Sequence, residues 1–324
     1  MRRVCYHSHG GPEVLAIEEA DIPAPGPGQV LIRTEAVGLN YVDVQIRRET
    51  TAGSIYYRPL PGKLTGDVVG TVEQVGPNTD AALGGRRVAV LLEDGCADYV
   101  VADTDWLADA PAGLSAGAAS LLPTAGAVAL GALRTGRLQP GETVLVTAGA
   151  GGIGHLAVQL ARIKGADTVI ATAGSAAKLD FLKELGADIV VDHTRADWAG
   201  QVRLAAPGGV NVILEAVGGQ LLHQAIGLLA PFGRVVAYGA SAGDLTSVPV
   251  TNLFALKTVS GFSLLAWRAA AREQARADIA ELTRLFAAGT LRPATETTLP
   301  LTEVVRAHRL LEARAVLGRP LLVP

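Results

Sequence analysis

The chain is poor in cysteine and in charge, and each scarcity excludes a class of protein. It holds 2 cysteines in 324 residues, Cys5 and Cys96, too few for a disulfide framework or a four-cysteine zinc lobe. The formal net charge is -3, without a basic cluster, which argues against nucleic acid as the main partner. Residues Met1–Gly10 lack the apolar core of a signal peptide. These absences favour a protein of the reducing cytoplasm.

One uncharged stretch could be mistaken for a membrane span. Residues Ala110–Leu133 contain no charged side chain, but Pro111, Pro123 and many small residues interrupt them. A pair of buried helices broken at Pro123 explains the stretch better. Apolar residues make up 49% of the chain and charged residues 18%, and 324 residues are long for one core. We therefore expect a globular protein of two domains.

The order of apolar runs and glycine-rich turns predicts an α/β fold. Up to about residue 110, short alternating runs lie between Gly and Pro, as in an all-β domain; three of them cover 29–37, 70–76 and 86–92. From 120 to 263, strand-like runs alternate with helical ones, which predicts an open, doubly wound parallel sheet. Its strands are expected over 144–146, 168–173, 189–191, 210–214 and 234–238, and its helices over 176–185 and 221–229. Beyond 264 we expect an amphipathic helix over 269–288, with Ile279, Leu282 and Phe286 on its apolar face.

A glycine turn joins the first of these parallel strands to a helix. The apolar run 144–146 is followed by Gly149, Gly151 and Gly154 in the pattern G-x-G-x-x-G. In a dinucleotide-binding site the first glycine permits the turn, the second lets the backbone approach the pyrophosphate, and the third lets the helix pack on the strand. The N-terminus of that helix offers N–H groups and partial positive charge to the phosphates. The sequence therefore predicts a dinucleotide site here.

The second strand indicates which dinucleotide is bound. An NAD site usually places Asp or Glu at the end of this strand, where the carboxylate holds the ribose 2′-hydroxyl. Here the strand 168–173 is followed by Gly174 and Ser175, without an acid. The missing carboxylate removes a repulsion against a 2′-phosphate, and this absence carries the most weight. Ser175 and Lys178 could donate to the phosphate, although Lys178 could equally be a solvated helix residue. We therefore expect NADPH rather than NADH.

Six short motifs follow one another along the chain: Gly38–Asp43, Gly66–Gly70, Gln139–Val146, Ala148–Gly154, Lys183–Asp188 and Ala307-His308. With them the chain resembles the medium-chain dehydrogenase/reductase superfamily over nearly its full length. It looks most like the zinc-free quinone oxidoreductase and zeta-crystallin branch, and enoyl reductases are close relatives. Several motifs in one order are far more specific than any one of them alone.

The resemblance implies a two-domain architecture. A GroES-like, β-rich catalytic domain would be made from both chain ends, residues 1–119 and 264–324, and a Rossmann NADPH-binding domain would span 120–263. It also implies a cleft where the domains meet, and a homodimer paired through the last strands of the nucleotide domain. In this chain that dimer edge would be Val248–Ser263, which is rich in β-forming and apolar residues.

The same resemblance allows metal use to be tested. Zinc-dependent members place a Cys, a His-Glu pair and a later Cys or Asp where this chain has Asn40, Gly66-Asp67 and Pro123-Thr124. Neither a catalytic nor a structural zinc site can be assembled from these residues, and we expect no metal. His7 and His9 could face the same side of a strand, but we interpret that pair as incidental.

Loss of zinc limits the substrate. Reduction of a simple ketone needs a Lewis acid or a positioned proton donor at the developing alkoxide, whereas a quinone or enone spreads the charge to a remote oxygen. Tyr41 is the best proton-donor candidate, because some similar enoyl reductases carry a tyrosine there; it could equally be an amphipathic wall residue. Gln45 replaces a tyrosine of the zeta-crystallin-like proteins, which puts ordinary quinone specificity in doubt. The residues expected to line the substrate pocket are Asn40, Gln45, Tyr56, Tyr57 and Thr124.

The resemblance also places residues along the cofactor. His193 lies where a Tyr or His approaches the adenosine end, and three further segments lie where family members contact the nicotinamide half. The expected cofactor-binding residues are Ala150, Gly151, Gly152, Ile153, Gly154, Gly174, Ser175, Lys178, His193, Val217, Gly219, Tyr238, Gly239, Ala240, Phe262, Ser263 and Leu264. His155, His223 and His308 are interpreted as packing residues.

Three functions are compatible with these features. The first is an NADPH-dependent reductase of conjugated carbonyls, most simply a quinone oxidoreductase. The second is an enoyl reductase acting on an α,β-unsaturated thioester or a natural-product intermediate. The third is a non-catalytic NADPH-binding protein, since some zeta-crystallin relatives have structural or RNA-binding roles; the net charge of -3 disfavours RNA. In each case the expected ligands are small molecules, with no membrane and no nucleic acid.

Overall fold

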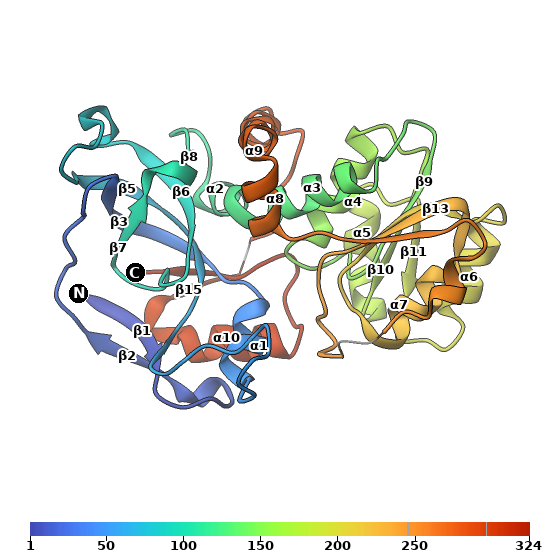
Figure 1. The fold of residues 1–324 in the computed structure, drawn as a ribbon, viewed down its shortest axis with the longest axis horizontal. Helices are drawn as coiled ribbons and strands as arrows, with labels where there is room; N and C mark the ends of the chain where they lie inside the picture. The colour runs from blue at the N-terminus through green and yellow to red at the C-terminus, as the bar shows by residue number, and fades with distance from the viewer. Residues whose placement is uncertain (245–246, 296) are drawn as a thin grey trace. The chain divides into compact units, whose positions relative to one another are not determined.

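The computed structural model describes residues 1–244, 247–295 and 297–324. The chain divides into two compact units: unit 1 comprises Met1–Thr124 and Ile279–Pro324, and unit 2 comprises Ala125–Asp278. Unit 1 therefore contains both chain ends, drawn in blue and red in Figure 1, and unit 2 the green to orange middle. The domain boundaries expected after residues 119 and 263 stay a prediction; helix α8 (Leu264–Ala270) lies in unit 2.

Unit 1 is built on two β-sheets. The seven-stranded sheet has the order β15-β16-β3-β5-β6-β8, with β7 also pairing β3. Its strands are β3 (Gln29–Gly38), β5 (Gly66–Val75), β6 (Arg87–Leu92), β7 (Tyr99–Asp103), β8 (Ala108–Asp109), β15 (Thr298–Pro300) and β16 (Leu321–Val323). The three-stranded sheet has the order β2-β1-β4, from β1 (Arg2–Tyr6), β2 (Leu15–Glu19) and β4 (Gly62–Lys63).

The alternation of side chains along β3 explains its place in the sheet. Arg33 and Glu35 are exposed, whereas Thr34 and Ala36 between them are buried, as expected for a strand with one face on a core. At its far end β3 pairs with the C-terminal strand β16, with Leu321 opposite Gly38. This pairing joins the last residues of the chain to the N-terminal part of unit 1 (Figure 1). The helices of unit 1 are α1 (Val42–Arg48), α2 (Ala116–Ser120) and α10 (Val304–Glu312).

Unit 2 is a doubly wound sheet, as predicted. Six parallel strands have the order β11-β10-β9-β12-β13-β14, so the strand order reverses between β9 and β12. The strands are β9 (Thr143–Val146), β10 (Thr168–Ala173), β11 (Ile189–Asp192), β12 (Val210–Glu215), β13 (Leu229–Ala237) and β14 (Thr258–Gly261). The helices of this unit include α3 (Ala127–Thr135), α4 (Gly154–Ile163), α5 (Leu179–Glu184), α6 (Trp198–Ala205) and α7 (Gly219–Ile226). Helix α9 (Arg272–Ala287) begins in unit 2 and ends in unit 1. The α/β fold class is therefore confirmed.

One helical segment differs in detail from the prediction, and the helix pair expected around Pro123 is present. The helix expected over 269–288 is two helices, α8 and α9, because Ala271 leaves helical geometry at φ −135° and ψ 52°. Its apolar face is confirmed: Ile279, Leu282 and Phe286 are buried. The uncharged stretch forms α2, a π-helical turn over 122–126 that contains Pro123, and α3. Among the described residues, every helix is too short or too polar to cross a bilayer.

Candidate active site

The glycine loop between β9 and α4 turns at a residue other than the one predicted. Ala148 has the left-handed φ of 49°, whereas Gly149 does not, so the expectation that Gly149 makes the turn is wrong. Gly149 is needed for close approach instead, because a Cβ there would lie 3.0 Å from Leu182 Cδ2 and 3.2 Å from Ala171 Cβ. A Cβ at Gly154 would overlap the carbonyl oxygen of Ala148 and lie 2.7 Å from the Gly149 Cα. The third glycine therefore lets α4 begin directly against the loop, as predicted.

The surface of this loop is mostly bare backbone. Gly151, Gly152 and Ile153 are partly exposed, while Ala150 and Gly154 are buried. His155 follows in the first turn of α4, fully buried, with Nδ1 3.0 Å from the Gly151 carbonyl oxygen, which fits its interpretation as a packing residue. The loop thus presents main chain and the first-turn N–H groups of a ten-residue helix, the arrangement that suits a pyrophosphate.

Gly174, Ser175 and His193 come together at the carboxyl end of β10. His193 Nδ1 lies 2.8 Å from Thr172 Oγ1, and a Cβ at Gly174 would lie 3.5 Å from His193 Nε2. Ser175 precedes the short turn Ala176–Lys178 without capping it through its side chain. Lys178 ends that turn and is half-buried. The region expected to hold the adenosine end therefore places the His193 ring beside an exposed glycine, with Ser175 and Lys178 in the turn that follows.

The acid at the end of β11, the strand that pairs with β10, already has hydrogen-bond partners within the protein. Asp192 ends β11, one strand further from the glycine loop, and its Oδ1 accepts hydrogen bonds from Thr194 N at 2.9 Å and Thr194 Oγ1 at 2.6 Å. These two hydrogen bonds hold the pKa of Asp192 below its usual range. The end of β10 itself carries no acid, as the sequence showed.

A buried carboxylate that sequence reasoning missed supports the loop after β12. Glu215 is fully buried and accepts hydrogen bonds from Val217 N at 2.7 Å and Gly218 N at 3.0 Å, and from Thr147 Oγ1 at 3.4 Å. Burial raises its pKa. Gly218 and Gly219 have φ values of 79° and 56°, which permit the tight start of α7. Glu215 thus ties the Val217–Gly219 segment to the end of β9.

The neighbouring strand end contains an unsatisfied hydroxyl. Within the described part of the chain, the buried Tyr238 Oη has no hydrogen-bond partner. Burial and the nearby Glu215 carboxylate both raise the pKa of Tyr238, so it stays a neutral donor. A Cβ at Gly239 would lie 2.9 Å from the Ala216 carbonyl oxygen, and Ala240 follows, half-buried. A buried donor without a partner, beside glycine backbone, fits a ligand that the polypeptide does not itself supply.

The last predicted cofactor segment has largely structural contacts. The Phe262 ring packs where a Cβ on Gly131 would otherwise lie, and its centroid is 5.9 Å from that of Trp267. Ser263 caps α8 by accepting from Ala266 N at 3.4 Å, and Leu264 is buried. Of these three side chains, Ser263 is exposed. A cofactor contact here would come from Ser263 or from backbone rather than from the Phe262 ring.

In unit 1, two residues predicted separately meet on one carboxylate. Asp67, fully buried, accepts from Asn40 Nδ2 at 3.2 Å and from Thr124 Oγ1 at 2.6 Å. Arg319, 2% exposed, forms an ion pair with the same carboxylate. Its Nη1 also donates to Asn40 Oδ1 at 3.2 Å, and its Nη2 to Ser120 Oγ at 2.9 Å. We call Asn40, Asp67, Ser120, Thr124 and Arg319 the Asp67 cluster.

Strand register assembles this cluster. Asp67 and Leu321 lie opposite the same residue of β3, Gly38, from its two sides. Arg319 reaches Asp67 across this position because Gly38 has no side chain: a Cβ there would overlap the guanidinium group. Sequence reasoning missed Arg319 and Ser120, since the arginine lies 252 residues from its carboxylate. Only the pairing of the C-terminal strand with β3 at Leu321 places Arg319 beside Asp67.

The Asp67 cluster stands where the resemblance places catalytic zinc, and its donors do not fit that metal. Zinc sites use thiolate, imidazole and carboxylate ligands with lone pairs directed at the ion. Here the single carboxylate, Asp67, is paired with a guanidinium, and the Asn40 amide directs its N–H toward it. A divalent cation would have to displace the buried positive charge of Arg319. The structure therefore places a fixed ion pair at this position.

The four remaining pocket candidates lie near the start of α1 or in the segment before β4. Tyr41 is half-buried at the N-cap of α1, with the Arg314 guanidinium 5.7 Å from its ring centroid. Gln45 and Tyr56 share a side-chain hydrogen bond, and burial raises the pKa of Tyr56. Tyr57 turns toward His9, with ring centroids 5.7 Å apart. The structure thus pairs Gln45 with Tyr56 and gives Tyr57 a different neighbour.

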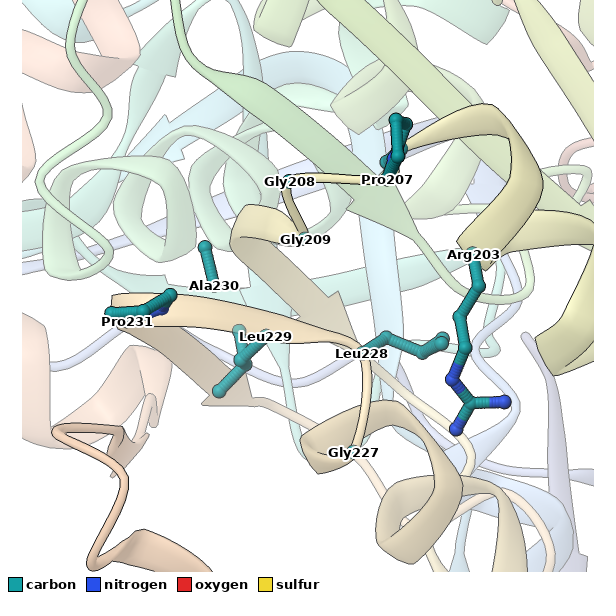
Figure 2. A pocket seen from close by; sticks show the side chains of 10 residues that line it. Arg203, Pro207, Gly208, Gly209, Gly227, Leu228, Leu229, Ala230 and Pro231 are labelled. Carbon is teal, nitrogen blue, oxygen red and sulfur yellow. The ribbon is translucent and has the colours of Figure 1, made fainter.

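A hollow of about 270 Å³ lies elsewhere on unit 2 (Figure 2). It is lined by Arg203, by residues just before β12 and β13 such as Gly208 and Gly227, and by the first residues of β13, among them Pro231. These are the amino ends of the strands, whereas doubly wound sheets bind their cofactors at the carboxyl ends. The hollow is therefore separate from the glycine loop.

Comparison with known proteins agrees with this architecture. Residues 26–120 match the family model "Alcohol dehydrogenase GroES-like domain", and residues 152–286 match "Zinc-binding dehydrogenase". The Escherichia coli protein Quinone oxidoreductase 1 is 30% identical over 99% of both chains. A 2-haloacrylate reductase from Burkholderia is 31% identical, over 98% of this chain and 97% of that protein. The human synaptic vesicle membrane protein VAT-1 homolog is 31% identical, over 100% of this chain and 86% of its own.

Solved structures match over the whole chain. A mycobacterial protein complexed with NADPH has 32% identity and a TM-score of 0.91, and covers 100% of both chains. Escherichia coli quinone oxidoreductase complexed with NADPH has 29% identity and a TM-score of 0.89, also over 100% of both chains. The enoyl reductase CurK has 25% identity and a TM-score of 0.88, over 99% of this chain and 98% of its own.

These relatives and the two-unit fold define an oxidoreductase architecture. The chain belongs to the medium-chain dehydrogenase/reductase superfamily and is of the quinone oxidoreductase type.

Proposed function

We propose that this protein is an NADPH-dependent reductase that transfers a hydride to a conjugated carbonyl acceptor, most simply a quinone, without zinc. The observation that carries the proposal is the Asp67 cluster. Its carboxylate is neutralised by Arg319, so the position that holds a Lewis acid in zinc-dependent relatives holds an ion pair instead. A substrate that disperses its own negative charge needs no Lewis acid.

Several features of unit 2 support NADPH as the cofactor. The bare glycine loop suits a pyrophosphate, and the end of β10 carries no acid. His193 lies beside the exposed Gly174, and Ser175 and Lys178 belong to the turn that follows. The unpartnered Tyr238 hydroxyl provides a buried donor at the end of β13. Two of the structural neighbours were solved with NADPH. When bound, this cofactor supplies a hydride from its nicotinamide ring.

The hydrogen bonds within the Asp67 cluster decide which groups remain to act on a substrate. Thr124 already donates its single O–H to Asp67, so it can accept from a substrate but not donate to it. The Asn40 amide is fixed at both ends, because Oδ1 accepts from Arg319 and Nδ2 donates to Asp67. Its second N–H is the donor that we assign to the substrate oxygen. Tyr41 is proposed as the proton donor to the reduced product.

Steady-state kinetics with a panel of acceptors test this proposal. With NADPH, we expect 1,4-naphthoquinone to be reduced at least ~100-fold more efficiently in kcat/KM than cyclohexanone, because the saturated ketone lacks the means to disperse charge. Removal of metal by a chelator should leave quinone reduction unchanged. Efficient, chelator-sensitive reduction of cyclohexanone would refute the proposal.

A second candidate is an enoyl reductase acting on an α,β-unsaturated thioester or a natural-product intermediate. The similarity to the CurK enoyl reductase and to a 2-haloacrylate reductase favours it, as does Tyr41 at the N-cap of α1. Crotonyl-coenzyme A in the same assay separates the two candidates. If the thioester is preferred over the quinone and Tyr41→Phe abolishes only its reduction, the second candidate replaces the first. If NADPH binds but no acceptor in the panel is reduced, the protein is a non-catalytic NADPH-binding protein.

We also propose that the protein forms a homodimer through the edge of the unit 2 sheet. β14 is the last strand in the sheet order, and the segment before it carries exposed Val250, Phe254 and Leu256. An open edge beside exposed apolar side chains favours pairing with a second copy. Light scattering should give twice the chain mass of 33.3 kDa, and Phe254→Asp should shift the protein to the monomer. A monomeric wild-type protein would refute this part of the proposal.

A further inference from the structure

Three possible metal ligands converge on the hairpin of β1 and β2 in unit 1, away from the Asp67 cluster. Cys5 lies in β1 and His7 directly follows that strand, so the two residues share one face, and Glu18 of β2 lies across the hairpin. His7 Nε2 lies 3.8 Å from Cys5 Sγ and 2.6 Å from Glu18 Oε1. The three ligand atoms all lie within 4.8 Å of one another.

The geometry of this trio distinguishes a metal site from a catalytic relay. In a Cys-His-acid relay, one ring nitrogen faces the sulfur and the other faces the carboxylate. Here the sulfur and the carboxylate both face the same nitrogen, Nε2. Tetrahedral zinc with bonds of 2.0–2.3 Å holds its ligand atoms about 3.5 Å apart. The Cys5–His7 separation of 3.8 Å is close to that spacing already.

We propose that Cys5, His7 and Glu18 form a binding site for a thiophilic divalent cation of the Zn²⁺ class, with water as the fourth ligand. A thiolate, an imidazole and a carboxylate are the donor types that zinc prefers. On binding, the Cys5 S–H proton goes to solvent, the sulfur lone pair forms the metal bond, and the His7–Glu18 hydrogen bond is replaced by two metal–ligand bonds.

The surroundings of the trio are compatible with a cation. Arg3 Nη2 lies 3.7 Å from Glu18 Oε2, the oxygen that faces away from His7, and so leaves Oε1 as the metal ligand. Lys63 is paired with Asp94 at 2.5 Å, which reduces its repulsion toward the site. The His7 side chain is 65% exposed and that of Glu18 34%, which provides an entry path from solvent. The buried Cys5 supplies the inner ligand.

His9 does not belong to the site, although its spacing from His7 suggested a histidine pair. Its ring lies between those of Tyr6 and Tyr57, with centroids 5.9 Å and 5.7 Å away. The partner of His7 is therefore a cysteine two residues earlier, and the acid comes from the other strand. His9 and the second cysteine, Cys96, whose buried Sγ lies 3.8 Å from the Thr65 carbonyl oxygen, are matched controls.

Equilibrium dialysis with Zn²⁺ and absorption spectra with Co²⁺ test the proposal on the full chain. We expect one Zn²⁺ per wild-type chain and a thiolate-to-Co²⁺ charge-transfer band. Cys5→Ser and His7→Asn should each weaken Zn²⁺ binding by at least about 100-fold and remove or shift that band. Cys96→Ala and His9→Ala should bind like the wild type.

Two outcomes would overturn the proposal. One is zinc binding that Cys5→Ser and His7→Asn leave unchanged while both variants unfold like the wild type in urea. The other is a Co²⁺ spectrum without a thiolate band. The His7→Asn variant keeps the test sharp if Cys5→Ser fails to fold, because His7 is exposed and its replacement leaves the core intact. The site lies outside the proposed active site, so NADPH-dependent activity should be the same in His7→Asn and the wild type.

Discussion

The glycine loop of unit 2 is built from backbone, whereas the Asp67 cluster of unit 1 is built from side chains. The loop from Thr147 to Gly154 offers backbone, and its shape depends on Gly154, whose Cβ would meet other backbone atoms. The cluster is made of side chains from four separate segments, closed around a buried ion pair. The first can receive an external anion, whereas the second has already neutralised its own charge.

This difference predicts which kind of substitution should destabilise each region. Adding a single methyl group damages the loop, because backbone cannot move aside. Removing a single partner damages the cluster, because a buried charge is then left uncompensated.

Arg319→Leu should give the largest loss of stability. It leaves the Asp67 carboxylate buried without its guanidinium partner, so we expect the free energy of unfolding to fall by about 3–5 kcal/mol. Arg306→Leu is the matched control, since its ion pair with Glu303 is exposed and should contribute less than about 1 kcal/mol. Urea unfolding measures both. Equal losses in the two variants would contradict the account of the cluster.

Asp43 is a second buried carboxylate of unit 1 and can be compared with Asp67. It accepts hydrogen bonds from Thr65 N and Thr65 Oγ1 instead of pairing with an arginine. Burial raises its pKa from 3.8 to about 7. The native state therefore holds this proton more tightly than the unfolded state does. Its contribution to stability is complete below about pH 4 and is lost as the pH rises to about 7.

The change over that window should be about 2–4 kcal/mol, from the usual 1.36 kcal/mol per pKa unit. Urea unfolding at several pH values between about 4.5 and 8 measures this change in the free energy of unfolding. In Asp43→Asn this pH dependence should flatten. A variant profile parallel to that of the wild type would show that Asp43 does not titrate in this window.

Gly154→Ala tests the loop. Its added Cβ would overlap the Ala148 carbonyl oxygen, so we expect a loss of about 1–3 kcal/mol in stability and at least about tenfold weaker NADPH binding. Gly200→Ala is the control in the same unit, because a Cβ on Gly200, within α6, meets nothing within 4 Å. That substitution should leave NADPH binding unchanged and slightly raise stability. Fluorescence titration with NADPH and urea unfolding give both quantities.

Lys178→Ala should have the smallest effect. Loss of one ammonium group near the proposed 2′-phosphate site should weaken NADPH binding about fivefold to tenfold and leave NADH binding unchanged. Lys183→Ala is the control, because Lys183 pairs with Asp180 on the exposed face of α5. Equal effects of Lys178→Ala on both cofactors would show that Lys178 does not contact the 2′-phosphate.

The fold and the glycine loop could be predicted because their signals are local. Apolar runs with glycine turns give the parallel strands, and one short segment contains strand, turn and helix. The turn residue was assigned wrongly, since Ala148 rather than Gly149 takes the positive φ. A sequence pattern shows where glycine occurs but not which neighbour adopts the strained conformation.

The Asp67 cluster could be predicted only in part. Asn40 and Thr124 were found through the family resemblance, and their shared partner Asp67 lay in a recognised motif. Arg319 and Glu215 had no local signal, because their roles depend on strand register and on burial. The roles of Tyr41, Gln45, Tyr56 and Tyr57 stay predictions.

The most direct test of the central claim is NADPH oxidation by metal-depleted His7→Asn protein with 1,4-naphthoquinone and with cyclohexanone. This variant removes the proposed hairpin cation site, so any remaining metal dependence belongs to the active site. The account predicts full quinone reduction without metal and kcat/KM at least ~100-fold lower for the ketone. Quinone reduction that disappears on metal depletion and returns with added zinc would contradict it.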